Sequence, residues 1–205
     1  MQQEARDMVQ QRNAWKVFLA QEGPEQDIAQ GPHLYYNKTV WQILPVHSDI
    51  AGSFVTALAP RDQAQPNFRT LVLLGTHYQT LGIAVPARAP RMNLWPLRGL
   101  RFAVKDAYRL RGLKTSLSTI VQTMVAAGAH VVAMTKLSSM IGKEEPTEAT
   151  EYHVPFDPRG DGYQSPAGSS GGNAAAVATY GWLDFAIGTD TIGSAQRPAL
   201  GNGIF

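Results

Sequence analysis

The residues best suited to catalysis in this chain are a lysine and several serines that stand beside glycines. Lys105 comes directly after the apolar run Leu100–Val104, and two adjacent serines stand inside the stretch Gly168–Gly172. Ser194 ends a polar loop that begins at Gly188, after another apolar run. A serine nucleophile needs a base, and a lysine acting through a second serine can replace the more common histidine and aspartate. The three segments together therefore favour a serine nucleophile with a lysine base.

Each segment alone also has a simpler interpretation. A lysine at the end of a strand is most often solvated, although a buried lysine loses its proton more readily because burial disfavours the ammonium form. Serines between glycines also fit a linker, a turn or the start of a helix. The loop after Gly188 also fits an ordinary turn at the end of a strand. The catalytic interpretation depends on the three segments occurring together.

The glycine–serine stretch does not fit two better-known motifs. It matches the G-x-S-x-G pattern with Ser170 in the centre, but that serine follows a strand and its histidine comes later in the chain. Here the proline-rich stretch Pro155–Pro166 precedes the serines, and no histidine follows His153. A phosphate-binding G-x-x-x-x-G-K-[ST] loop is excluded because no lysine follows the glycines.

The loop Gly188–Ser194 follows an apolar strand-like run, which is where α/β proteins place their ligands. Consecutive backbone N–H groups in such a loop can converge on an anion, and this geometry suits an oxyanion. The loop therefore predicts either the oxyanion site of an enzyme or the anion site of a binding module.

Composition and charge exclude several other classes of protein. The chain has 205 residues, 44% hydrophobic and 17% charged, as in globular proteins. A net charge of +2 excludes a general electrostatic attraction to nucleic acid or to an anionic membrane. The absence of cysteine excludes disulfides and thiolate nucleophiles, and the five histidines lack metal-ligand spacing. The sequence contains no apolar run of membrane-spanning length and no apolar signal core, so we expect a cytoplasmic protein.

The chain changes character near residue 95, and we expect two regions. Residues 1–95 are predicted to be a small β-rich region of unknown role, with a short helix over 1–22 and a linker over 86–96. Its strands are expected at 39–44, 54–58, 70–74 and 81–85. Residues 96–205 alternate as an α/β domain, with strands at 100–104, 131–135 and 183–187 and helices at 119–127 and 173–180.

Four segments, in the same order, resemble the amidase signature family. LRFAVKDAYRLRG at 100–112 resembles the strand with the family's catalytic lysine, and AAGAHVVAMTK at 126–136 resembles its helix–strand segment. The stretch from Asp157 to Gly172 resembles the glycine–serine loop, and GTDTIGSAQRPA at 188–199 resembles the nucleophile segment. The resemblance runs from about Gly99 to the C-terminus. It implies an α/β fold with a mixed sheet flanked by helices, incomplete at the C-terminus and preceded by the β-rich region.

The resemblance also implies a catalytic triad. Lys105 would be the base, Ser169 the bridging serine with a cis peptide bond, and Ser194 the nucleophile. Ser170 and Asp190 would be supporting residues. The implied oxyanion hole consists of the backbone N–H groups of Thr191, Ile192, Gly193 and Ser194.

Ile192 stands where the family pattern has a glycine, so a positive φ at this position would strain the loop.

The activity implied by the resemblance is hydrolysis of a carboxamide C–N bond through a serine acyl-enzyme. The expected partner is a small-molecule amide, without nucleic acid or membrane and without a metal or organic cofactor. Family members continue far beyond the last matched segment, so a truncated or catalytically inactive amidase-like protein is an alternative, as is an anion-binding module. No oligomeric state follows from the sequence.

Overall fold

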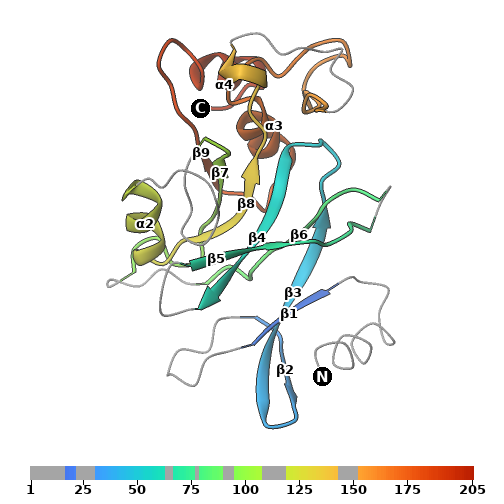
Figure 1. Ribbon diagram of the computed structural model, residues 1–205, viewed down its shortest axis with the longest axis vertical. Helices are drawn as coiled ribbons and strands as arrows, with labels where there is room; N and C mark the ends of the chain where they lie inside the picture. The colour runs from blue at the N-terminus through green and yellow to red at the C-terminus, as the bar shows by residue number, and fades with distance from the viewer. Residues whose placement is uncertain are drawn as a thin grey trace.

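Two β-sheets form the body of the protein (Figure 1). The computed structural model describes residues 17–21, 31–62, 67–76, 79–89, 95–107, 119–142 and 152–205. In the view of Figure 1, the first sheet reaches toward the lower end of the molecule. The carboxyl ends of the central strands of the second sheet, together with α3, lie toward the upper end.

The first sheet is antiparallel and is built around one long strand. β3 (Thr39–Ser48) pairs with β1 (Val17–Gln21), β2 (His33–Tyr36) and β6 (Gly82–Ala84). The turn between β2 and β3 places Asn37 at φ 50° and Lys38 at φ 60°. Two consecutive positive φ angles are the signature of the tight hairpin turn that matches the twist of the flanking strands.

The helix expected over residues 1–22 is wrong for its described part. Residues 17–21 form β1, and the rest of that expected helix lies outside the described residues. The segment VFLAQ pairs along its whole length with β3, which supplies partners for its backbone groups. A short apolar run without caps has too little intrinsic helix preference to resist such pairing.

The second sheet is mixed, as expected, in the order β5-β4-β8-β7-β9. β7 (Arg101–Lys105) runs parallel to β8 (His130–Thr135) and to β9 (Phe185–Ile187). β4 (Phe54–Asp62) lies antiparallel to β8 and to β5 (Asn67–Leu71). The sheet thus combines strands from both sides of residue 95, while the division into regions 1–95 and 96–205 stays a prediction.

Two helices of the structure were expected from the sequence, and two short helical elements were not. α2 (Thr119–Ala126) and α3 (Gly171–Thr179) confirm the two expected helices, with α3 beginning two residues early. The strands of the second half are confirmed to within one or two residues. α4 (Gln196–Gly201) and a short 3₁₀ turn (Ser139–Ile141) have no counterpart in the sequence-based expectation.

β7 has hydrophobic core on both of its faces. Phe102 and Val104 pack in the cluster that contains Val121 of α2, whereas Ala103 packs in the cluster that contains Ala176 of α3. Successive side chains of a strand point to opposite faces, so Lys105 belongs to the same face as Ala103. The fold therefore directs the side chain of Lys105 to the α3 side of the sheet.

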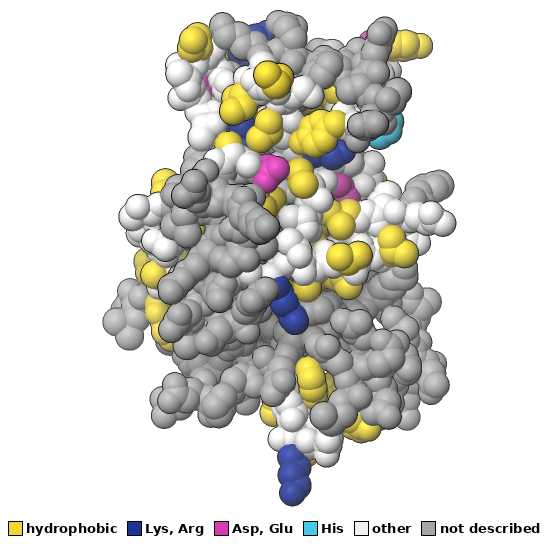
Figure 2. Space-filling model, viewed as in Figure 1, with side chains coloured by type: hydrophobic (Ala, Val, Ile, Leu, Met, Phe, Trp, Pro, Cys, Tyr) yellow, Lys and Arg dark blue, Asp and Glu magenta, His cyan; other side chains and the backbone are white. Residues whose placement is uncertain are grey.

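The described surface carries several large hydrophobic side chains. Val72, Tyr163 and Met140 are 95%, 95% and 97% exposed. Figure 2 shows hydrophobic side chains interspersed with charged ones on one face of the molecule. None of the helices in the described part of the chain is long and apolar enough to cross a membrane.

Candidate active site

Lys105 ends β7 with its side chain completely buried. Its Nζ donates a hydrogen bond to Ser169 Oγ at 2.7 Å and another to Thr189 Oγ1 at 3.2 Å. Burial of an amine away from water disfavours the ammonium form, and hydroxyl partners compensate a charge less than a carboxylate does. The amine of Lys105 is therefore held out of water against two hydroxyl groups.

Ser169 lies in the loop that leads into α3, and its side chain is completely buried. The peptide bond between Gly168 and Ser169 is cis, as the resemblance implied. The Ser169 carbonyl accepts a hydrogen bond from the Ser138 N–H at 3.2 Å, which connects this loop to the segment after β8. The hydroxyl of Ser169 is thus held on the side of the sheet to which Lys105 points.

Ser194 is half-buried and lies in the segment between β9 and α4. Its carbonyl accepts a hydrogen bond from the Ser170 N–H at 3.0 Å. This bond brings the backbone of Ser194 beside the residue that follows Ser169. The structure thus joins Lys105 and Ser169 through their side chains and attaches the Ser194 segment to them through the backbone, while the three catalytic roles stay predictions.

Asp190 organises the loop that carries Ser194. Its carboxylate accepts backbone hydrogen bonds from Gly193 at 2.6 Å, Ala195 at 2.9 Å and Gln196 at 3.0 Å. The N–H groups of Gln196, Ala195 and Gly193 lower the pKa of this exposed carboxyl below its ordinary value. An ionised Asp190 therefore folds the chain tightly around Ser194.

The predicted oxyanion loop is compatible with its isoleucine. Gly193 has φ 95°, whereas Ile192 is not among the described residues with positive φ. The strain that an isoleucine would suffer at positive φ is therefore absent. Because the Gly193 N–H donates to Asp190 in this conformation, the roles of Thr191, Ile192, Gly193 and Ser194 toward an oxyanion stay a prediction.

Thr189 contacts Lys105 and was not identified from the sequence, because no local motif distinguishes it. Its position follows from topology: Thr189 comes after β9, which is the parallel neighbour of β7. Parallel strands bring residues at their carboxyl ends to the same edge of the sheet. The order of β7 and β9 in the sheet, which decides this contact, was not readable from the sequence.

Ser170 and Gly188 show how closely the supporting residues pack. A Cβ atom added at Gly188 would lie 3.0 Å from both Ser170 Oγ and Asn173 Nδ2. The Ser170 hydroxyl is buried and has no hydrogen-bond partner among the described residues. Ser170 is therefore placed beside the Lys105–Ser169 pair, but its supporting role stays a prediction.

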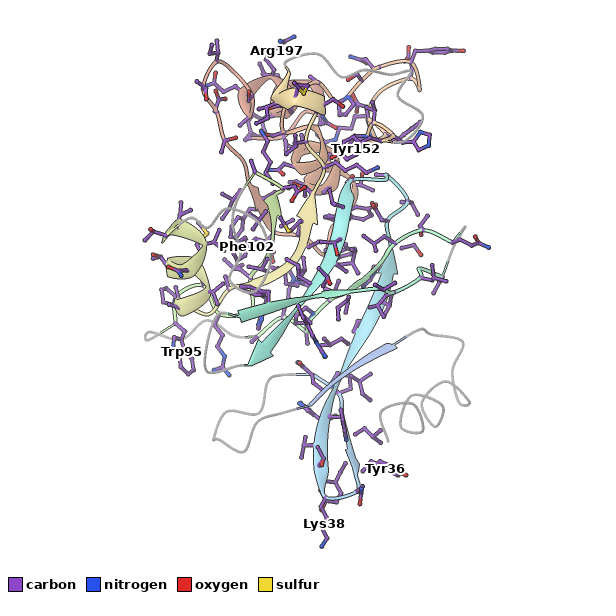
Figure 3. All side chains as sticks on the ribbon, in the orientation of Figure 1. Tyr36, Lys38, Trp95, Phe102, Tyr152 and Arg197 are labelled. Carbon is purple, nitrogen blue, oxygen red and sulfur yellow. The ribbon has the colours of Figure 1, made fainter. Side chains whose placement is uncertain are left out.

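Arg197, labelled in Figure 3, lies toward the same end of the molecule as α3. The stem of Arg197 covers Gly193, where an added Cβ would meet its Cγ at 3.3 Å.

Burial raises the pKa of Asp106, the residue that follows Lys105. No group of histidine, aspartate and glutamate side chains that could hold a metal ion occurs among the described residues.

Comparisons with known proteins show which family the sequence matches. The family model described as amidase matches residues 83–205. Amidase 1 of Oryza sativa subsp. japonica is 37% identical over 131 residues, which cover 57% of this chain and 29% of the relative. A glutamyl-tRNA(Gln) amidotransferase subunit of Halobacterium salinarum is 37% identical over 122 residues, covering 53% of this chain and 28% of the relative.

A solved structure is also similar to part of the chain. The native peptide amidase from Stenotrophomonas maltophilia shares 29% sequence identity with a TM-score of 0.44, covering 52% of this chain and 25% of that protein. The chain therefore spans less than a third of the length of these relatives.

Proposed function

The chain belongs to the amidase signature family, and from this premise we propose that it hydrolyses a carboxamide C–N bond through an acyl-enzyme on Ser194. The observation that carries the proposal is the hydrogen bond of 2.7 Å between Lys105 Nζ and Ser169 Oγ, two completely buried groups. A buried amine against a buried hydroxyl is the arrangement that a proton relay to a serine nucleophile needs.

In the acylation step, neutral Lys105 accepts the proton of Ser169, and Ser169 accepts the proton of Ser194. The Ser194 oxygen then bonds to the carbonyl carbon of the amide, and the C=O electron pair moves to the oxygen. Backbone N–H groups of the 191–194 loop would stabilise this oxyanion, and losing one such donor typically costs about 3 kcal/mol of barrier. The tetrahedral intermediate expels the amine, which receives the proton from Lys105 through Ser169.

In the second step, a water molecule gives a proton to the same relay and attacks the acyl carbon. The carboxylic acid leaves, and Ser194 regains its proton. The proposal needs no metal or organic cofactor, because each proton and electron pair stays among the substrate, water and the three side chains. The proposed substrate is a small-molecule amide.

A serine-reactive fluorophosphonate probe tests the proposal directly. The folded chain should be labelled once, on Ser194, and Ser194→Ala should remove the label. Ser139→Ala is the matched control, because Ser139 is an exposed serine in the 3₁₀ turn and should leave labelling unchanged. A folded chain that the probe does not label would contradict the proposal and favour a catalytically inactive amidase-like protein.

A further inference from the structure

Asn202, at the C-terminal end of α4, has a completely buried side chain. Its Nδ2 donates hydrogen bonds to the carbonyl oxygens of Pro166 at 3.1 Å and Pro198 at 2.9 Å. Because both partners are acceptors, the nitrogen end of the amide must face them, and both of its N–H groups are used. Asn202 thus joins two segments that are far apart in the sequence.

Each of the two segments carries one of the proposed catalytic serines. Pro166 is three residues before Ser169 in the loop that enters α3, and Pro198 is four residues after Ser194 in α4. We infer that Asn202 is a positioning residue that fixes the Ser169 segment against the Ser194 segment. The effect of Asn202 on catalysis rests on the proposed function. Its joining of the two segments by hydrogen bonds does not.

A second side chain fastens the same turn. Arg159 donates through Nη1 to the carbonyl of Gly203, the residue after Asn202. Arg159 belongs to the loop that runs from 152 to 170 without regular secondary structure. A loop of this kind has no ladder of backbone hydrogen bonds, so its position depends on such ties from side chains. The end of α4 is therefore anchored to this loop at two points.

The tie by Asn202 complements the direct bond between Ser170 N–H and Ser194 carbonyl. That bond joins the two segments directly at the serines, and Asn202 joins them again at Pro166, before Ser169, and at Pro198, four residues after Ser194. Two connections restrict rotation of one segment against the other, whereas one connection permits it. A proton relay needs this restriction, because a misplacement of about 1 Å can cost on the order of 100-fold in rate.

The amide is well suited to this position because it donates twice without carrying a charge. Asn202→Asp keeps the shape of the side chain but turns a carboxyl group without N–H donors toward two carbonyl oxygens. Hydrogen–deuterium exchange in the variant should become faster in both segments, 164–170 and 193–198. Labelling of Ser194 by the fluorophosphonate probe should become roughly 100-fold slower at an equal fraction of folded protein.

Leu44→Ala is the control for a merely structural effect. Leu44 is a buried core residue of β3 in the first sheet, so its truncation weakens the fold without touching the tie. If Asn202→Asp does not fold, Asn202→Ser replaces it, because a serine keeps one donor and should give smaller changes of the same kind.

The inference is wrong if exchange in the two segments and the labelling rate change no more in the folded Asn202 variant than in Leu44→Ala. A wild-type chain that the probe does not label would remove the proposed function alone. The exchange measurement would then still decide whether Asn202 ties the two segments together.

Discussion

Lys105 differs from an ordinary lysine at the end of a strand in what surrounds its amine. Ordinary lysines keep the ammonium group in water, whereas this side chain is completely buried and touches the hydroxyls of Ser169 and Thr189. Such an environment stabilises an ammonium group poorly. Lys105 is therefore proposed as the base because its amine is buried against two hydroxyls, and not simply because it is a lysine.

Lys105→Met tests this role while preserving most of the side-chain volume in the core. We expect labelling of Ser194 to fall by about 10²–10⁴-fold, the usual contribution of a general base. In the wild type, the labelling rate should rise with pH as the amine loses its proton, and in the variant this rise should disappear. The measurement is the labelling rate as a function of pH on the alkaline side.

Lys136→Met is the matched control for that experiment. Lys136 follows β8, the neighbour of β7, and its Nζ donates to the carbonyl of His153 at 2.9 Å. Its replacement should leave the pH profile as in the wild type. An alkaline rise that persists in Lys105→Met would remove Lys105 from the mechanism.

The sequence indicated which side chains could form the site better than it indicated which distant residues hold them in place. Lys105 was identifiable because it ends a strand, whereas Ser169 was chosen from its serine pair only through the family resemblance, and the structure places the two side chains in contact. Thr189 and Asn202 were not identified, because each acts through partners distant in the sequence. Nothing in the local pattern around Asn202 distinguishes a buried tie from an ordinary turn.

At the scale of elements, the strands near the site were predictable and their partners were not. The expected strands at 100–104 and 131–135 are β7 and β8, shifted by one residue at most. The antiparallel addition of β4 to β8 was not foreseen, because it depends on contacts between segments far apart in the sequence rather than on local hydrophobic pattern. The error at β1 has the same cause.

The start of α3 shows how closely one element is fitted to its neighbours. A Cβ atom at Gly172 would lie 2.5 Å from the carbonyl oxygen of Lys136 and 2.6 Å from that of Ser53. Both contacts are with backbone, which cannot rotate away as a side chain can. Only glycine therefore lets α3 begin against the segments that follow β8 and precede β4.

Gly172→Ala should accordingly destabilise the fold, although alanine is the better helix former. Overpacking of this kind costs about 1–3 kcal/mol or more in the free energy of unfolding, which exceeds the gain of about 1 kcal/mol in helix propensity. Gly181→Ala is the control, since no described residue other than its chain neighbours places an atom within 4 Å of a Cβ at that position. Urea unfolding measures both variants, and equal midpoints for the two would contradict the close fit.

At the scale of the whole molecule, one arginine acts on histidines of both sheets. Burial, and then the positive charge of Arg101, lower the pKa values of His47 on β3 and His130 on β8. Arg98 lowers the pKa of His130 further. Arg101 itself is held by Asp184, whose carboxylate accepts from the Arg101 backbone N–H at 2.8 Å. The fold therefore keeps both histidines neutral at pH values where an unfolded chain would protonate them.

This difference predicts a loss of stability in mild acid. As the pH falls below about 6.5, the histidines of the unfolded chain take up protons before those of the folded chain do. The free energy of unfolding should therefore decrease as the pH falls through this value, by at most about 1.4 kcal/mol per pH unit for each histidine. Asp106, whose pKa is raised by burial, contributes with the opposite sign wherever it titrates.

Urea unfolding between about pH 7.5 and pH 5.5 checks this prediction in His130→Gln, which removes the titrating group while keeping a polar side chain. The decrease in the free energy of unfolding should become smaller in this variant than in the wild type. His153→Gln, at an exposed histidine, should keep the full decrease. An equal slope in His130→Gln and the wild type would mean that the folded chain accommodates a protonated His130, and Arg101 would then not hold it neutral.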